Sequence, residues 1–294
     1  MLRLGIGITT YNRAEALART LERLAAHTRA PHAFFVADDG SQDDTLAVLR
    51  GRGVPHVTAA NRGVAWNKNR ALFYLHEVAR CDVVILMEDD TFPQADAWEE
   101  PWIRAAVRFG HANLAGSWFA ERFVGGEGTP EDPVLCSDIS GQCIAFSRPA
   151  LQAVGYMDTR FGRYGFEHCD HSERMREAGF GGRLDPPVYY LIRSDLAVTC
   201  AHAPAADYTG ELEKNSRVLA QLRLERRIHR PPWSGLGEMR LFLGEMRRAA
   251  LPDAGQRHQL GRAVAQASLR GGASWLGQQM RGWPPGRDPQ HTVA

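Results

Sequence analysis

The sequence predicts an α/β fold in which a mostly parallel sheet is flanked by helices and followed by a helical C-terminal extension. From residue 2 to residue 87, apolar runs of strand length alternate with segments of helical spacing, which is typical of a doubly wound sheet. Polar residues collect where these runs end. From about Tyr208 the pattern changes to charged helical segments. We therefore predict two domains, residues 1–207 and residues 208–294.

Size and composition exclude several classes of protein. A chain of 294 residues can bury a sizeable core, and its formal net charge of +1 argues against a dedicated nucleic-acid binder. The five cysteines are scattered and odd in number, so they predict neither a disulfide framework nor a zinc site, and they fit a reducing compartment. No apolar segment approaches the roughly 20 residues that span a bilayer, and the N-terminus lacks a signal-peptide pattern. We expect a cytoplasmic protein.

The first strand is predicted at residues 2–9, where apolar residues alternate with glycine. It ends at the polar run TTYNR, residues 9–13. Leucines then recur at helical spacing up to Leu24, which predicts an amphipathic helix. Asn12 is a residue type that commonly caps such a helix at its N-terminus.

Three more strands are predicted before residue 90. Residues 33–37 end in the sequence DDGS, and residues 54–59 end in NRG. A helix is predicted at residues 64–79. The fourth strand is the apolar run at residues 83–87, which reaches three consecutive acids, Glu88, Asp89 and Asp90.

These strand ends are predicted to form a ligand site. The carboxyl ends of parallel strands meet at one edge of a sheet, and ligands bind just beyond them. A purely structural role would place polar residues at both ends of the strands, although DDGS alone is also typical of a turn. The residues expected to converge are Thr9, Tyr11, Asp38, Asp39, Arg62, Glu88, Asp89 and Asp90.

The acidic triplet at residues 88–90 suggests a divalent cation. Adjacent carboxylates repel one another unless a cation joins them, and Mg²⁺ and Mn²⁺ prefer carboxylate oxygen. The alternative interpretation is a solvated acidic strand end without a ligand. The convergence of polar strand ends favours the cation.

Three later segments add candidates. Residues 123–133 hold glycines and prolines among acids and are predicted to form a loop over a site. Glu167 and Asp170 open a predicted helix, where acids either satisfy free N–H groups or act as a general base at a cleft. His202 ends an apolar run at residues 196–202. A lone histidine is more often structural, so His202 is a ligand candidate only if its strand ends beside the acidic triplet.

Several motifs, taken in order, resemble the glycosyltransferases of family 2, which have the GT-A fold. IGITTYNR at residues 6–13 resembles the opening strand of that family, and ADDGSQD at residues 37–43 resembles its second-strand motif. NRGVAWNKN at residues 61–69 matches its N-x-G segment, and the triplet EDD takes the place of its D-x-D metal motif. Residues 155–158 and 167–170 resemble its G-x-x-D and E-D-x-D segments. The resemblance covers about residues 1–202 and leaves the C-terminal part uncovered.

The resemblance implies metal-dependent transfer of a sugar from a nucleotide donor, most often a UDP-sugar, to an acceptor nucleophile, with inversion. The acceptor would be a glycan, a lipid-linked or small molecule, or a peptide. The implied contacts are Thr9 and Tyr11 with the nucleobase, Asp39 accepting a hydrogen bond from the base, and Asp89 at the ribose. Arg13, Arg62 and Lys68 are the implied cations for the pyrophosphate. The implied ligands of Mn²⁺ or Mg²⁺ are Glu88, Asp90 and His202.

Two residues depart from the family pattern. Glu88 stands where aspartate is usual, which keeps the negative charge but changes the geometry with which the carboxylate would bind the metal. His168 stands where the family has the aspartate that acts as base in inverting enzymes. The acceptor must lose a proton, so a carboxylate near the anomeric carbon is expected. We place Glu167 first as that catalytic base, Asp170 next, and keep His168 itself as a third candidate.

Two other functions are alternatives. A sugar nucleotidyltransferase also uses a metal on an α/β sheet, but normally needs a glycine-rich loop after the first strand, and residues 9–13 contain no glycine. A non-catalytic nucleotide-sugar-binding or assembly subunit has its best support in His168. The C-terminal helices are expected to pack on the domain or to mediate self-association. Peripheral contact with the inner face of a membrane is the alternative, because interfacial helices combine arginine with Trp and Leu.

Overall fold

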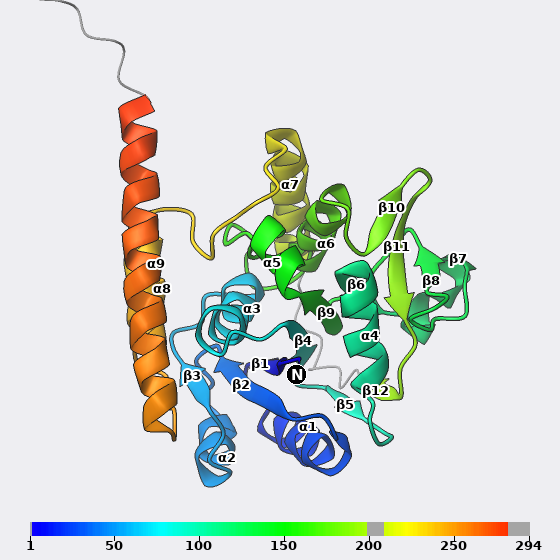
Figure 1. The fold of residues 1–294 in the computed structure, drawn as a ribbon, viewed down its shortest axis with the longest axis horizontal. Coiled ribbons are helices and arrows are strands. Elements are labelled where there is room, and N and C mark those ends of the chain that lie inside the picture. The colour runs from blue at the N-terminus through cyan, green and yellow to red at the C-terminus, as the bar shows by residue number, and fades with distance from the viewer. Residues whose placement is uncertain (1, 199–208, 282–294) are drawn as a thin grey trace, which may run out of the picture.

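The computed structural model describes residues 2–198 and 209–281. In these ranges the chain forms a ten-stranded sheet with the strand order β3-β2-β1-β4-β9-β6-β11-β8-β7, and β10 pairs with β11 beside this path (Figure 1). The strands of this sheet are β1 (Leu4–Thr10), β2 (His32–Asp38), β3 (His56–Thr58), β4 (Val83–Glu88), β6 (His111–Leu114), β7 (Phe123–Gly125), β8 (Val134–Cys136), β9 (Cys143–Ser147), β10 (Gly182–Leu184) and β11 (Pro187–Ile192). A second sheet of two strands joins β5 (Thr91–Pro93) to β12 (Leu196–Val198).

The half of the large sheet that begins at β3 is parallel. β1 pairs in parallel with both β2 and β4, and β2 pairs in parallel with β3. Beyond β4 the pairing is mixed, because β9 runs antiparallel to β4 and to β6, whereas β6 and β11 are parallel. The predicted α/β class is confirmed, and the predicted strand ends belong to the parallel half.

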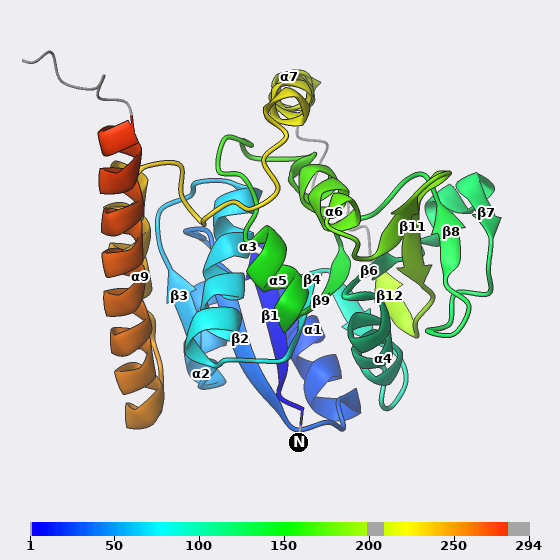
Figure 2. The same ribbon diagram turned by 45° about the horizontal axis from the view of Figure 1, so that its top comes forward.

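Helices cover both faces of the sheet (Figures 1 and 2). One face packs on α1, α2 and α4, where Leu17, Leu49 and Trp102 belong to a single buried cluster. The other face packs on α3, η1, α5, α6 and the C-terminal helices. The helices are α1 (Ala14–His27), α2 (Thr45–Gly51), α3 (Val64–Phe73), the π-helix η1 (Tyr74–Val78), α4 (Glu100–Phe109), the 3-10 helix η2 (Ser117–Arg122), α5 (Arg148–Val154), α6 (Glu167–Glu177), α7 (Thr209–Glu225), α8 (Leu236–Met246) and α9 (Ala254–Arg281).

The C-terminal helices share a core with the sheet layer. Leu222 of α7, Phe242 of α8 and Val264 of α9 lie in the same buried cluster as Phe73 of α3. The backbone of Ala250 also bridges to His56 on the edge strand β3. The packing expected for these helices is therefore observed, while the domain division at residue 207 and self-association stay predictions. None of the helices in the described ranges is both long and apolar enough to cross a bilayer.

Some predicted details differ from the structure. Asn12 does not cap α1, whose N-cap is Arg13. Asn12 has a positive φ of 52°, and its side-chain oxygen accepts a hydrogen bond of 2.7 Å from the backbone N–H of Gln42. It therefore joins the loop after β1 to the loop after β2. The predicted loop at residues 123–133 begins with β7, which pairs with β8 at the far edge of the sheet from β3.

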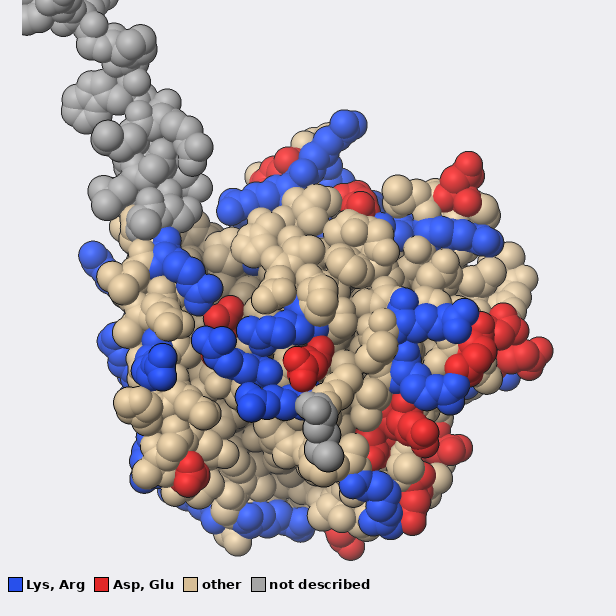
Figure 3. Space-filling view, viewed as in Figure 1, with Lys and Arg blue, Asp and Glu red and all other residues tan. Residues whose placement is uncertain are grey.

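The surface carries both signs of charge. On the face in Figure 3, Lys and Arg side chains gather toward the centre and left, and Asp and Glu gather toward the lower right. In Figure 2, β1 begins near the N-terminal label at the bottom of the view and runs up into the sheet layer. The candidate site described next lies at the other end of β1.

Candidate functional site

The acidic triplet after β4 lies against the loop after β1. The hydroxyl of Thr10 donates a hydrogen bond of 2.7 Å to Asp89 Oδ2. Arg13 Nη1 lies 2.5 Å from Asp90 Oδ2 and 3.3 Å from Asp89 Oδ1. The predicted meeting of these strand ends is therefore present. Arg13, expected at the pyrophosphate, contacts two of the three acids.

The triplet offers the oxygen donors that suit a hard divalent cation. Asp89 and Asp90 are buried, whereas the Glu88 side chain is 32% exposed. Burial, together with the charge of Glu88, raises the pKa of Asp90, and burial raises the pKa of Asp89 to about 7. The positive charge of Arg13 therefore does not offset the cost of burying these acids, and a divalent cation would favour their ionised forms.

The described residues include only two of the three predicted metal ligands. Within residues 2–198 and 209–281, no three His, Cys, Asp or Glu side chains are grouped as a ready metal cage. His202, the third predicted ligand, belongs to residues 199–208 and lies outside the described part of the chain. Glu88 and Asp90 are thus the two predicted ligands whose surroundings are known.

Asp39 is buried at the start of the loop after β2 and accepts several hydrogen bonds. Its Oδ1 accepts from the backbone N–H of Arg62 at 3.0 Å and from Arg70 Nη1 at 2.9 Å. Its Oδ2 accepts from the backbone N–H of Gly63 at 2.9 Å. Burial raises the pKa of Asp39, although these donors and the charge of Arg70 act in the opposite direction. Of the residues predicted for the nucleobase, Tyr11 is 44% exposed and Thr9 is buried.

Glycine is needed at position 63. Gly63 has a positive φ of 91°, and a Cβ there would lie 2.5 Å from the carbonyl oxygen of Gly162. The residue therefore allows the loop before α6 to pack closely on the start of α3. This explains physically why the N-x-G segment carries glycine.

Arg70 and Glu245 belong to this site and were not predicted. Arg70 is fully buried on α3, and its Nε and Nη2 donate to Glu245 Oε2 at 3.1 and 3.0 Å. Glu245, from α8, also accepts from Trp66 Nε1 at 2.8 Å and from Arg62 Nε at 3.0 Å. The one available signal was a second basic residue two positions after Lys68 in the same helix.

Lys68 is fully buried and joins the acidic triplet to the candidate base. Its Nζ donates to Glu88 Oε1 and Glu167 Oε1, each at 3.0 Å, and to the carbonyl oxygen of Gly141 at 3.1 Å. These contacts use the three donors of an ammonium group. Burial would lower the pKa of Lys68, but the charges of Glu88 and Glu167 raise it above its ordinary value. A role for Lys68 at the pyrophosphate stays a prediction.

Glu167 is the first residue of α6 and is 2% exposed. Its Oε1 contacts Lys68 and lies 3.3 Å from His168 Nδ1, while its Oε2 is buried and has no hydrogen-bond partner among the described residues. Burial would raise the pKa of Glu167, but Lys68 and then His168 hold it well below its ordinary range. Burial would lower the pKa of His168, but the charge of Glu167 raises it to about 10. At neutral pH, Glu167 is therefore ionised and His168 is cationic, which favours Glu167 as the base.

Asp170 has a different environment. Its Oδ2 accepts from both Nε and Nη2 of Arg174 at 2.8 Å. Arg174 also donates to the carbonyl oxygens of Val154 and Tyr156, so the pair joins α6 to the end of α5. Burial raises the pKa of Asp170, and Arg174 opposes that rise. These contacts favour the structural role for Asp170 that the sequence left open.

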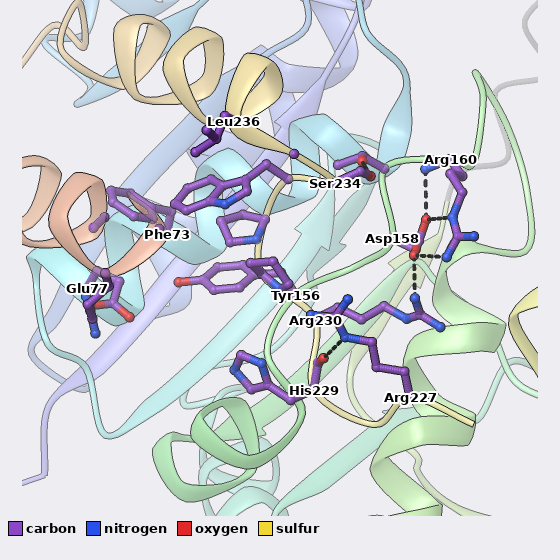
Figure 4. A pocket seen from close by; sticks show the side chains of 18 of the residues that line it. Phe73, Glu77, Tyr156, Asp158, Arg160, Arg227, His229, Arg230, Ser234 and Leu236 are labelled. Carbon is purple, nitrogen blue, oxygen red and sulfur yellow. Dashed lines mark hydrogen bonds and ion pairs between the residues drawn. The ribbon is translucent and has the colours of Figure 1, made fainter. Parts of the chain in front are cut away.

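A separate cavity of about 600 Å³ lies between α3, the chain before α8, and α9 (Figure 4). On one side of it, Asp158 accepts from Nε and Nη2 of Arg160, both at 2.9 Å, and lies 2.9 Å from Arg230 Nη1. None of the residues that line this cavity is a predicted donor, metal or catalytic residue. Asp158 of the G-x-x-D segment therefore connects the C-terminal part of the chain to the α/β layer, away from the acidic triplet.

Residues 6–138 match the family model described as Glycosyl transferase family 2. No curated protein matches the sequence. Among solved structures, the mannosyltransferase PcManGT from Pyrobaculum calidifontis, in complex with GDP-Man and Mn²⁺, superposes with a TM-score of 0.51 at 17% identity, over 95% of this chain and 79% of that chain. TarS 1-349 from S. aureus superposes with a TM-score of 0.46 at 16% identity, over 93% of this chain and 72% of that chain. The catalytic domain of Drosophila β1,4-galactosyltransferase 7, in complex with xylobiose, superposes with a TM-score of 0.43 at 13% identity, over 70% of this chain and 74% of that chain.

At 17% identity the first likeness shows the fold, and the family model adds the activity class. The matched residues 6–138 contain β1 from Ile6 onward, β2 and β4, and the polar ends that these strands bring together. The family match and the fold together show a glycosyltransferase with the GT-A fold, whose residues 6–138 are similar to family 2.

Proposed function

We propose that the chain transfers a sugar from a UDP-sugar to an acceptor hydroxyl, with Mn²⁺ or Mg²⁺ bound and with inversion at the anomeric carbon. The observation that carries this proposal is the contact series Glu88–Lys68–Glu167, in which one buried ammonium joins an acid at the end of β4 to an acid at the start of α6. It brings a carboxylate suited to a metal and an ionised carboxylate suited to a base into one connected site.

In the proposed reaction, the acceptor oxygen attacks the anomeric carbon and the bond from that carbon to the β-phosphate oxygen breaks with its electron pair. The hydroxyl proton passes to Glu167, which is ionised and has an oxygen without a partner among the described residues. A carboxylate of low pKa is a weak base, so most of the barrier must be lowered at the leaving diphosphate. Glu88 and Asp90 would hold the metal, which neutralises that charge when bound.

Asp39 supports uracil as the base of the donor. An ionised carboxylate offers about four acceptor positions, and the N–H groups of Arg62, Gly63 and Arg70 use three of them. The remaining position, on Oδ2, suits the single N–H that uracil presents between two carbonyl groups. Guanine presents two adjacent donors and would need two positions. The exposed ring of Tyr11 is available to stack on the base.

Titration calorimetry with UDP and with GDP, each in Mn²⁺ and in EDTA, tests the donor half of this proposal. The complex of the P. calidifontis mannosyltransferase with GDP-Man makes GDP the informative competitor. We expect UDP to bind in Mn²⁺ and to lose that binding in EDTA and in the Asp90→Ala variant, whose circular dichroism should stay unchanged. Binding of GDP in place of UDP would overturn the uracil assignment. Binding of UDP that ignores both EDTA and Asp90→Ala would overturn the metal assignment.

A further inference from the structure

Glu245 is a buried acid outside the segment that matches the family model. It lies on α8 with 2% exposure. Its Oε2 accepts hydrogen bonds from Trp66 Nε1 and from Nε and Nη2 of Arg70, and its Oε1 accepts from Arg62 Nε. Burying a carboxylate and the arginines around it costs free energy, so a buried group of this kind calls for a functional explanation.

Arg70 connects Glu245 to Asp39. Two edges of its guanidinium are in use, since Nε and Nη2 contact Glu245 while Nη1 contacts Asp39 Oδ1 at 2.9 Å. Its remaining donors go to the side-chain oxygen of Asn67 and the carbonyl oxygen of Ala60, both at 3.0 Å. All five N–H donors of the group are therefore taken, and its orientation is determined.

The orientation of Arg70 decides how much of Asp39 stays available. An arginine beside a carboxylate prefers a two-bond fork that occupies both oxygens. Such forks occur here, with Nε and Nη2 of Arg160 on Asp158 and of Arg223 on Glu173, whereas the same two nitrogens of Arg174 share Oδ2 of Asp170. Glu245 takes that same edge of Arg70, so only Nη1 reaches Asp39 and one acceptor position on Oδ2 is left.

We propose that Glu245 is a positioning residue for nucleobase recognition, which keeps Asp39 open to a base with one N–H donor by holding the fork of Arg70 away from it. The inference rests on the proposed UDP-sugar activity and extends it to a residue on the C-terminal helices. Without the Glu245 charge, Arg70 turns its fork toward Asp39 and covers the acceptor that the base needs.

Glu245→Gln tests this inference, because glutamine keeps the shape and can still accept from Trp66 but loses the charge. We expect UDP in Mn²⁺ to bind about tenfold more weakly, equal to about 1.4 kcal/mol, with an unchanged requirement for the metal. The control is Glu238→Gln on the same helix, where the native acid contacts Thr159 and the N–H of Ser234. That variant should bind UDP as the wild type does.

A pH profile separates this role from a purely structural one. Asp39 faces Arg70 and the backbone N–H groups of Arg62 and Gly63, and Glu245 lies on the other side of Arg70. Removing the negative charge of Glu245 makes the surroundings of Asp39 more positive. This favours the ionised form of Asp39, so the pKa of Asp39 falls. The acidic limb of UDP binding should therefore shift to lower pH in Glu245→Gln and stay in place in Glu238→Gln.

The outcomes are distinct. If the wild type binds UDP and a folded Glu245→Gln binds it equally well, the inference is wrong and the proposed function stands. If the wild type binds no UDP, the proposed donor and this inference both fall. Should Glu245→Gln fail to fold, Glu245→Asp keeps the charge but has a shorter side chain, so it should release the Nε and Nη2 edge of Arg70 and also weaken UDP binding. Wild-type affinity in a folded Glu245→Asp overturns the inference.

Discussion

Two buried cations on α3 differ in what surrounds them. Lys68 and Arg70 each join two acids from distant parts of the chain, and each uses every N–H donor that it has. Around Arg70, Glu245 is 2% exposed and both of its oxygens accept hydrogen bonds. Around Lys68, Glu88 is 32% exposed and Glu167 keeps a buried oxygen without a partner among the described residues. On its Glu245 side the first cluster is closed, and the second still has capacity to take up a cation or a proton.

The largest effect on activity should come from removing the charge of Glu167. We expect Glu167→Gln to lower kcat by about 10²- to 10⁴-fold while the Kd for UDP stays unchanged, because only the proton acceptor is lost. A donor-hydrolysis or transfer assay beside calorimetry measures both quantities. Glu177→Gln, at an exposed position on the same helix, is the matched control. Full activity in Glu167→Gln would move the base to Asp170 or His168.

The next effect compares the two cations directly. Arg70→Met leaves Asp39 and Glu245 buried without their shared cation, and we expect a loss of about 3–5 kcal/mol in the free energy of unfolding. Lys68→Met should cost less, since Glu88 is partly exposed and regains water. Urea unfolding followed by circular dichroism gives both values. A larger loss in Lys68→Met than in Arg70→Met would contradict the division into a closed and an open cluster.

The smallest effect concerns pH. The pKa of His168 is raised to about 10, above its unfolded value of about 6.5, so its contribution to stability is complete below about pH 6.5 and is lost as the pH rises toward 10. The pKa of Glu167 is lowered, so its contribution is present above about pH 4.3 and is lost as the pH falls below that value. We expect the melting temperature to decline between about pH 6.5 and 10. In His168→Asn that decline should be shallower, and a slope equal to that of the wild type would show that the Glu167–His168 pair does not stabilise the fold.

The strand ends were predictable because their signals are local. An apolar run followed by acids gives both a strand and the point where it ends, and parallel pairing brings such ends to one edge. The meeting of Thr10 and Arg13 with Asp89 and Asp90 follows from that rule. Asn12 shows its limit, since a good capping residue type joins two loops instead when its backbone has a positive φ.

The helix after the third strand was the harder part to predict. Every residue of α3 from Ala65 to Phe73 is buried, so the helix has no solvent face on which a basic residue would be expected. The outer side of α3 is covered by α8, where Phe242 contacts the rings of Trp66 and Phe73. Nothing in the spacing of α3 itself indicates that cover. Lys68 and Arg70 were therefore not recognised as the centres of two buried clusters.

Residue types and their spacing were sufficient for the α/β class, the order of the first strands and the edge where polar groups meet, because hydrophobic period and strand-end chemistry act over a few neighbouring residues. Which cation meets which acid was decided only by the fold. Glu245 and Arg70 are 175 residues apart in the chain, and they meet because α8 packs on α3. A buried charge is stable only beside a partner of opposite charge. The sequence contains the charged residues, but the tertiary structure decides which of them form pairs.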